Sequence, residues 1–341
     1  MLTMKHTAPA FAATHVNMKR LFPIVAFAAI AGTIQSAAAQ VYPSRPITIV
    51  NPFPAGGATD ILARTLADHM KGALGQPVIV ENISGAGGSI GVGRVVRAAS
   101  DGYSLGLGQW ASHVGAPAIY PIQYDVLKDL EPISLLATTP LWIVTRNTLP
   151  AKDLKELIAW LKANPEKASA GTVGPGSASH MCGIYFQNNT GTRFQFVPYR
   201  GGGPAMQDLL AAHIDLMCDM AANSLAQVRG GKLKAVAVMA KTRWFAAPDV
   251  PTVEEAGLPA LYFSFWHGLW APKGTPQDVI AKLNAAVVNA LADANVRQRF
   301  ADQGQEIPPR DQQTPTALAA HHKAEIEKWW PIIKAANVKA E

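Results

Sequence analysis

The sequence predicts an α/β protein of two lobes with a cleft between them. Three observations support this prediction: short apolar strands alternate with helical patterns, glycine-rich loops join strands to helices, and two extended apolar stretches interrupt the alternation. Strands and helices in alternation are typical of parallel sheets covered by helices. Two chain crossings between such lobes make a hinged pair, which suits a protein that closes around a small solute.

The N-terminus has the order of a secretory signal peptide. The basic pair Lys19-Arg20 precedes an apolar run over 21–34, and three alanines at 37–39 precede the expected cleavage before Gln40. The run is too short for an ordinary membrane span. We therefore expect a cleaved leader and export to an oxidising compartment.

Removal of residues 1–39 leaves a mildly basic chain. Met18 stands directly before the basic pair, so translation starts at either Met1 or Met18. The leader carries three basic residues and no acidic one, so its loss lowers the formal net charge from +6 to +3. No stripe of Lys and Arg suggests nucleic-acid binding. No second apolar stretch reaches membrane-spanning length, so we expect a soluble mature protein. We also expect a monomer.

The first lobe opens on a strand over 47–50 and the loop Asn51–Asp60, whose sequence is Asn-Pro-Phe-Pro-Ala-Gly-Gly-Ala-Thr-Asp. Gly56 and Gly57 allow positive φ or a close approach to a ligand. Free N–H groups beside the positive end of a helix dipole would bind a carboxylate or phosphate. The alternative is that the glycines only turn a tight corner.

The first lobe then continues the alternation. A helix is expected from Ile61, capped by Thr59 or Asp60. Ligands of parallel sheets bind beyond the carboxyl ends of the strands, so the segment Gln109–His113 is also a candidate site. The elements in order are a strand over 78–81, a glycine-rich loop over 84–89, a helix over about 90–99 and a strand over 104–108 that ends at Gln109, Trp110 and Ser112.

Two extended stretches are expected to connect the lobes. Leu130–Thr145 is apolar and broken by two prolines, and Phe263–Trp270 reads as the return crossing. The predicted first lobe therefore comprises 40–141 and 266–341, and the second lobe comprises 142–265. The second lobe is expected to contain a helix over 154–163, strands over 169–172, 196–198, 214–218 and 233–239, and a helix over 205–212. Helices over 278–292, 296–303 and 316–336 close the chain.

Three glycine-rich loops, at 51–60, 171–180 and 199–205, each follow a strand and lead into a helix. One belongs to the first lobe and two to the second, so both walls of the cleft would present backbone donors. Three loops of the same kind are less easily explained as simple turns than one loop, so they favour anion binding. No phosphate-binding, metalloprotease or serine-hydrolase motif is present, and the run from Gly85 lacks the third glycine of a dinucleotide fingerprint. We therefore expect no enzyme activity, no cofactor and no metal.

Several polar and aromatic side chains have two interpretations each. His180 is a ligand donor or a capping, half-buried histidine. Asp219, at a strand end, faces either the cleft or a hinge hydrogen bond, and next to an anion it would need an amine, a hydroxyl or a water. Trp110 and His113, at a strand end, either contact the ligand or pack in the core of the lobe. His321-His322 is expected on a solvated face, and Trp329-Trp330 is expected to anchor packing.

The two cysteines, Cys182 and Cys218, leave two possibilities open. An exported protein can form a disulfide, but buried free cysteine is also a common packing residue. Neither cysteine has the spacing or the histidine neighbours of a metal site.

The whole mature chain resembles the Bug family, the extracytoplasmic solute receptors of tripartite tricarboxylate transporters. The resemblance is carried, in order, by Pro52–Asp60, Leu74–Asn82, Gly85–Gly88, Ala99–Tyr103, Gly174–Ser177 with His180, Val197–Gly201, Pro204-Ala205, Asp208-Leu209, Asp215–Met217 with Asp219, Asp249–Gly257 and Ala271–Pro276.

The resemblance implies a periplasmic binding protein of type II, with two crossing strands, that closes like a Venus flytrap on a carboxylate. One carboxylate would be held by backbone amides and water at Phe53, Ala55, Gly56, Ala58 and Thr59. The opposing lobe would contribute Ser177, His180, Gly203, Pro204, Ala205 and Asp219. Gly57, Asp60, Trp110 and Ser112 complete the candidate site. The implied partners are a small carboxylate and the membrane subunits of the transporter.

The chain departs from the usual family pattern at four places, and these bear on which ligand it binds. Ala55 replaces a proline, Met181-Cys182 replaces Leu-Ala, Cys218 stands where an aromatic is frequent, and Gln109–His113 is not the usual Thr- or Ser-rich run. We expect a mono- or dicarboxylate, including an aromatic one in view of Trp110. The alternatives are a periplasmic sensor partner of a signalling system and an enzyme on the same two-lobed fold.

Overall fold

The alternation of strands and helices builds one mixed sheet. The computed structural model describes residues 2, 10 and 42–338. In this part of the chain nine strands form a sheet with the order β2-β1-β3-β9-β4-β7-β5-β6, and β8 also pairs with β4. The chain from Tyr42 onward forms one compact unit. The predicted signal peptide and the choice of start codon lie outside the described residues.

Three parallel strands form what we call the first sheet half. β1 (Ile47–Asn51) lies between β2 (Val78–Asn82) and β3 (Ser104–Gln109). The helices α2 (Ala58–Leu74) and α3 (Ser89–Val96) connect them. The strands lie where the sequence predicts them. The prediction that Thr59 or Asp60 caps α2 is wrong, because the helix begins before Ile61 and its N-cap is Gly57.

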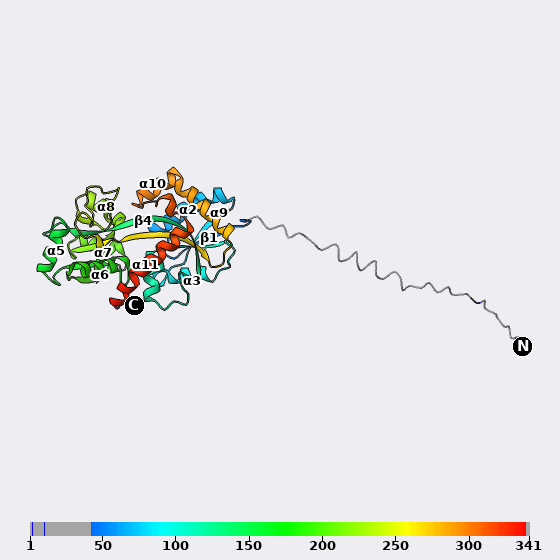
Figure 1. The fold of residues 1–341 in the computed structure, drawn as a ribbon, viewed down its shortest axis with the longest axis horizontal. Helices are drawn as coiled ribbons and strands as arrows, with labels where there is room; N and C mark the ends of the chain where they lie inside the picture. The colour runs from blue at the N-terminus through cyan, green and yellow to red at the C-terminus, as the bar shows by residue number, and fades with distance from the viewer. Residues whose placement is uncertain (1, 3–9, 11–41, 339–341) are drawn as a thin grey trace. The chain divides into compact units, whose positions relative to one another are not determined.

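The two extended stretches are the long strands β4 (Leu130–Arg146) and β9 (Ser264–Pro272). They pair antiparallel up to Pro140, which lies opposite Ser264. β9 also pairs with β3, whereas the rest of β4 pairs with β7 (Leu216–Met220) and β8 (Leu233–Val238). The crossing strands run antiparallel to their neighbours, so the sheet is mixed. Figure 1 shows β4 running between the green helices α5–α8 and the group α2, α9 and β1.

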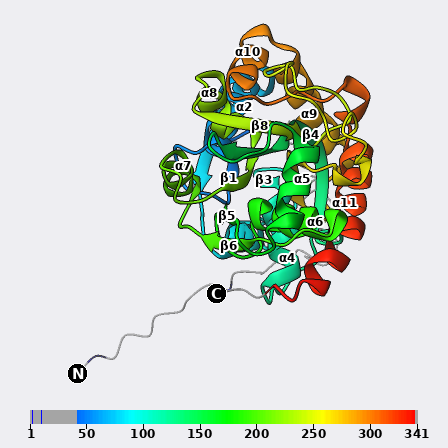
Figure 2. The same cartoon turned by 90° about the vertical axis from the view of Figure 1, so that its left-hand side faces the viewer.

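The second sheet half consists of β5 (Ser169–Thr172), β6 (Gln195–Pro198) and β7, which are parallel. Figure 2, which looks at the molecule from this side, shows helices on both sides of β5, β6 and β8. These helices are α5 (Leu154–Ala163), α6 (Ala178–Thr190), α7 (Gly202–Leu210) and α8 (Ala221–Arg229). Short helices occur at Ala86–Gly88, Ala111–Gly115, Ala116–Ile119 (α4), Pro259–Leu261 and Arg310–Gln312.

Three helices close the chain, as predicted: α9 (Gln277–Ala292), α10 (Ala294–Asp302) and α11 (Pro315–Ala335). The apolar stripe of α2 packs with that of α9 in one buried cluster, which includes Leu62, Leu66, Met70, Leu283 and Val287. In the described part of the chain, no single helix is long and apolar enough to cross a membrane. Together, α9 and α10 have the length and apolar composition of a membrane-spanning segment, but the two helices meet at a bend of 72°.

The helix α11 buries a stripe of side chains against the sheet. Trp329 is fully buried against Trp110 and Phe263, which confirms it as a packing anchor. The predicted solvated face at His322 is wrong, because its imidazole is buried and lies 2.9 Å from the carbonyl oxygen of His113. The reason is helical spacing, since the buried residues of α11 are Leu318, His322, Ile326, Trp329 and Ile333.

The two cysteines form a disulfide. The sulfur atoms of Cys182, on α6, and Cys218, on β7, are 1.94 Å apart. The bond therefore ties α6 to the sheet strand beneath it. The sequence alone left this pairing open, because it does not show that the two side chains meet.

Candidate functional site

A cavity of about 270 Å³ lies where loops of the two sheet halves meet. Phe53 and Gln109 come from the first half, and the ends of β5 and β7 with the loops after them come from the second. Among the lining residues, Asp219 is the only charged one. The complete lining is Phe53, Gln109, Ala111, Leu141, Val173, Ser177, Ala178, Ser179, Gly201, Gly202, Met217, Cys218, Asp219, Met220, Asn223 and Phe265.

The N-terminus of α2 lies beside this cavity and is joined to it by Gln109, which lines the cavity and donates to Thr59. Its N-cap, Gly57, has an extended backbone and offers no side chain to cap the helix. The backbone N–H groups of Ala58, Thr59 and Asp60 have no acceptor among the described residues. A helix of 17 residues therefore presents its uncapped positive end at this loop.

Asp60 braces the loop and is not free to meet a solute. Its carboxylate accepts hydrogen bonds from the Gly56 N–H at 3.0 Å, from Arg64 Nε at 2.9 Å and from Asn82 Nδ2 at 2.9 Å. The bond from Arg64, followed by those from Gly56 and Asn82, lowers the pKa of Asp60 although burial opposes this. Asn82 Nδ2 also lies 3.0 Å from the Phe53 carbonyl oxygen. Asp60 is thus better assigned to holding Phe53 and Gly56 in place.

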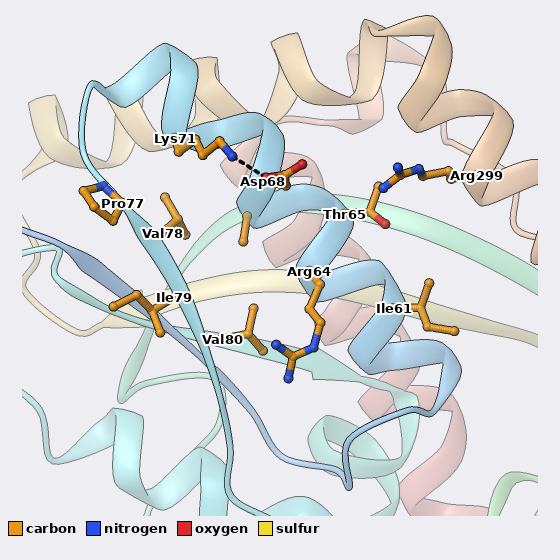
Figure 3. A pocket seen from close by; sticks show the side chains of 11 residues that line it. Ile61, Arg64, Thr65, Asp68, Lys71, Pro77, Val78, Ile79, Val80 and Arg299 are labelled. Atoms are coloured by element: carbon orange, nitrogen blue, oxygen red, sulfur yellow. Dashed lines mark hydrogen bonds and ion pairs between the residues drawn. The ribbon is translucent and has the colours of Figure 1, made fainter.

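The outer face of α2 borders a second, wider hollow of about 650 Å³, which Figure 3 shows between α2 and β2. Figure 3 places the Asp68–Lys71 ion pair on the helix above it and Arg64 next to Val80. None of the residues that line it belongs to a glycine-rich loop. We therefore do not assign a solute to this hollow.

Polar side chains connect the cavity to the first turn of α2. Gln109 Nε2 donates to Thr59 Oγ1 at 3.3 Å, and Thr59 Oγ1 lies 3.3 Å from His267 Nε2. Burial lowers the pKa of His267 to about 4, so the ring is neutral at neutral pH. His267 Nδ1 and both side-chain polar atoms of Asn51 are buried and have no partner among the described residues. Such groups are normally satisfied by water or a ligand.

The second wall contributes Asp219 at the end of β7. Its carboxylate accepts hydrogen bonds from Ser224 Oγ at 2.7 Å and from Asn223 Nδ2 at 3.1 Å. Burial outweighs these bonds and raises the pKa of Asp219 to about 6. Trp142 Nε1 donates to the same Ser224 hydroxyl at 2.9 Å. Asp219 therefore faces the cavity as a carboxyl group that gains a proton easily.

The loops before α6 and α7 supply the rest of the second wall. Ser177 is the N-cap of α6 and lines the cavity. In the third glycine-rich loop, Gly201 and Gly202 line the cavity instead of the expected Gly203, Pro204 and Ala205. Gly203 and Pro204 are exposed and Ala205 is buried, because α7 starts at Gly202 and carries them away from the cavity.

The structure does not place Trp110 and Ser112 at the cavity. Trp110 is fully buried, and its ring packs 5.1 Å from that of Phe263. Ser112 is also fully buried, and its hydroxyl bonds to the backbone of Gln109. His113 stacks on Trp270 with ring centroids 4.0 Å apart. The chain turns into a short π-helical segment, Ala111–Gly115, directly after Trp110, and this turn directs these side chains into the core.

Residues of the candidate site thus fall into three groups. Phe53, Ser177 and Asp219 line the cavity, and the other predicted residues do not. Of those, the loop and helix end that Gln109 joins to the cavity contain Ala55, Gly56, Gly57, Ala58, Thr59 and Asp60. The remaining ones are His180, Gly203, Pro204, Ala205, Trp110 and Ser112. Sequence reasoning included Gln109 only within a variable segment, and it missed His267 and Phe265. The sequence feature that could have indicated His267 as a site residue is its position as a polar residue within the apolar crossing stretch Phe263–Trp270. Among the described residues no group of three His, Cys, Asp or Glu is placed to hold a metal ion.

Comparisons with known proteins place this chain among proteins of one family. The family model described as "Tripartite tricarboxylate transporter family receptor" matches residues 62–338. Protein BugT of Bordetella pertussis is 37% identical over 95% of this chain and 99% of its own. MatC of Rhodopseudomonas palustris with bound malate is 38% identical, covers 86% of this chain and 100% of its own, and has a TM-score of 0.74. R. palustris Rpa4515 with adipate is 29% identical, covers 87% and 99%, and has a TM-score of 0.76.

Proposed function

The chain belongs to the tripartite tricarboxylate transporter receptor family, and we propose that it is a periplasmic receptor that captures an organic mono- or dicarboxylate for a membrane transporter. It carries out no chemistry on the solute. The predicted signal peptide and the family support the periplasmic location. The proposal includes action as a monomer.

The observation that carries this proposal is the uncapped N-terminus of α2 next to a cavity with no Lys or Arg in its lining. A carboxylate there would accept hydrogen bonds from Ala58, Thr59 and Asp60 N–H groups and lie at the positive end of the helix. Gln109 and the neutral His267 would orient it or its waters. Positive charge from a side chain is then not required.

The proposed lobes comprise 40–141 with 266–341 and 142–265. Two features of the crossing strands support this division: β4 changes partners after Pro140, and β9 begins at Ser264. The cavity lies between elements of the two parts, so a change in their relative orientation would open or close it.

The size and lining of the cavity support a small aliphatic acid. The cavity volume of about 270 Å³ lies slightly below the range of about 300–1,000 Å³ that is usual for small-molecule sites. The structures of MatC and Rpa4515, to which this chain is similar, contain malate and adipate. Trp110 no longer supports an aromatic solute because it packs in the core.

A thermal-shift screen with malate, succinate, adipate, citrate and benzoate tests the proposal. A ligand at one hundred times its dissociation constant adds about 2.7 kcal/mol to the free energy of unfolding. We expect at least one aliphatic dicarboxylate to do so, with their uncharged diamides as controls. Equal, small shifts for acids and diamides would contradict carboxylate binding.

A further inference from the structure

His180 has a place in the structure that differs from a ligand contact. It is the third residue of α6, its ring packs edge-on against Phe196, and it is absent from the cavity lining. Its Nδ1 accepts a hydrogen bond from the Gly176 N–H at 3.1 Å. Burial lowers the pKa of His180, so the ring is neutral at neutral pH and Nδ1 is available as an acceptor.

The loop that contains Gly176 is fixed by its own side chains. Ser177 Oγ donates to the Gly174 carbonyl oxygen at 2.7 Å, and the Val173 N–H donates to Ser179 Oγ at 3.0 Å. The bond to His180 holds the apex of the loop at Gly176. The loop 173–179 therefore behaves as one braced unit at the start of α6.

The apex of this loop touches the short helices that follow β3 of the first sheet half. A Cβ atom on Gly176 would lie 2.0 Å from Ile119 Cδ1, at the end of α4. A Cβ atom on Gly115 would lie 3.2 Å from the Gly176 carbonyl oxygen. Figure 2 shows α4 next to α6. Two glycines thus let the backbones approach across the boundary between the sheet halves, directly beside Ser177 in the cavity wall.

We propose that His180 is a positioning residue: its Nδ1 keeps Gly176 against Gly115 and Ile119, and this contact holds the two walls of the solute cavity together. The contact between Gly176 and the Gly115–Ile119 segment does not depend on the proposed function. Its effect on the retention of a solute does rest on that function. His180 then influences affinity without touching the solute.

Three variants separate this role from simple packing. In His180→Asn the side-chain oxygen takes about the place of Nδ1 and can still accept from Gly176. In His180→Gln the carbonyl reaches the place of Nε2, and in His180→Ala no acceptor remains. Two readouts need no solute: hydrogen exchange of the Gly176 amide, and the distance between spin labels at Lys128→Cys and Lys167→Cys. Cys182 and Cys218 do not react with the label, because they form a disulfide.

We expect His180→Asn to match the parent chain in both readouts. His180→Gln and His180→Ala should exchange the Gly176 amide roughly 2- to 12-fold faster, the effect of one hydrogen bond, and shift the label distances to larger values. If His180→Asn behaves like His180→Ala, or His180→Gln like the parent, the positioning role is refuted. Thermal unfolding of each variant identifies any that fail to fold.

A glycine pair provides an independent test. Gly176→Ala and Gly174→Ala both place a side chain at positive φ, but only the first meets Ile119, since nothing lies within 4 Å of a Cβ on Gly174. We expect longer label distances for Gly176→Ala alone, and their reversal by Ile119→Ala in the same chain. Equal distances in both glycine variants would refute the contact. Malate binding, measured in parallel on the parent chain, reports on the proposed function separately.

Discussion

The glycine-rich loops before α2 and before α6 look alike in the sequence but differ in how their helices are capped. At α2 the N-cap is Gly57, and the first N–H groups of the helix have no acceptor among the described residues. At α6 the N-cap is Ser177, whose hydroxyl accepts from the His180 N–H at 3.3 Å. The first loop is left open, whereas the second satisfies part of its own helix end.

This difference is the reason for proposing the first loop, and not the second, as the anion site. Glycine allows a backbone to approach a ligand, but the N–H groups bind an anion only if the chain does not already use them. In the second loop Ser177 and His180 bond to backbone N–H groups. We therefore assign the carboxylate to α2 and assign the α6 loop mainly to shaping the opposite wall.

The largest expected effect comes from making the first loop resemble the second. Gly57 has φ −80° and ψ 168°, which an N-cap aspartate adopts without strain. In Gly57→Asp the new carboxylate would occupy the helix end, so we expect solute affinity to fall at least about 100-fold. The free energy of unfolding should change by less than about 1 kcal/mol, because Asp is a good N-cap. Calorimetry with the best acid of the screen and chemical unfolding measure the two quantities.

Gly57→Val is the uncharged counterpart of Gly57→Asp and separates the effect of bulk at this position from the effect of charge. A Cβ atom at this position meets only the Pro54 carbonyl oxygen, at 3.8 Å, so the fold should tolerate it. We expect Gly57→Val to abolish binding by bulk alone, without a new charge. Affinity that survives both substitutions would show that the glycines only turn a corner.

The next effect concerns the charge of the second wall. The pKa of Asp219 is raised to about 6, so this carboxyl binds a proton in the folded state that it lacks in the unfolded state between about pH 4 and 6. Its contribution to stability is complete below about pH 4 and is lost as the pH rises through about 6. A carboxylate solute also favours the protonated form. Affinity should therefore fall by up to about tenfold per pH unit from pH 6 to 8.

Asp219→Asn removes the titrating group while keeping a side chain that can bond to Ser224. Affinity in this variant should vary less with pH than in the parent chain, and it should exceed the parent value at pH 8. Titration calorimetry at pH 6, 7 and 8 makes the comparison. Parallel pH profiles for the two proteins would exclude Asp219 from the solute site.

The smallest effect is expected at Ser177. Ser177→Ala removes the N-cap of α6, which costs about 1 kcal/mol of stability. Because the cap serves the helix and not the solute, affinity should change by less than about threefold. Urea unfolding and calorimetry measure both. A large loss of affinity with unchanged stability would make Ser177 a direct ligand contact and remove the difference between the two loops.

The sequence predicts the loops of this site better than its side chains. Alternating strand and helix patterns correctly locate β1, α2, β5, α6 and the crossing strands, because periodicity and glycine placement are local signals. Whether a glycine-rich loop is capped by its own side chain depends on where the helix begins. The sequence predicts Thr59 or Asp60 as the cap of α2, whereas the helix begins earlier and its N-cap is Gly57.

Tertiary packing explains the side chains that sequence reasoning misplaced. Trp110 follows a strand end, but the short helix Ala111–Gly115 directs its side chain into the core. His322 is polar and yet buried, because it lies on the inner stripe of α11 and bonds to a backbone carbonyl. His267 contacts Thr59 from 208 positions away. No local pattern contains such long-range contacts.

The most direct test of the central claim is to follow the backbone amides by NMR during a titration with malate, and then with the other acids of the screen. The claim predicts saturable downfield proton shifts at Ala58, Thr59 and Asp60, with smaller changes at the first turn of α6. Shifts confined to α6 or α7, or no saturable shift at the α2 amides with any acid, would contradict it.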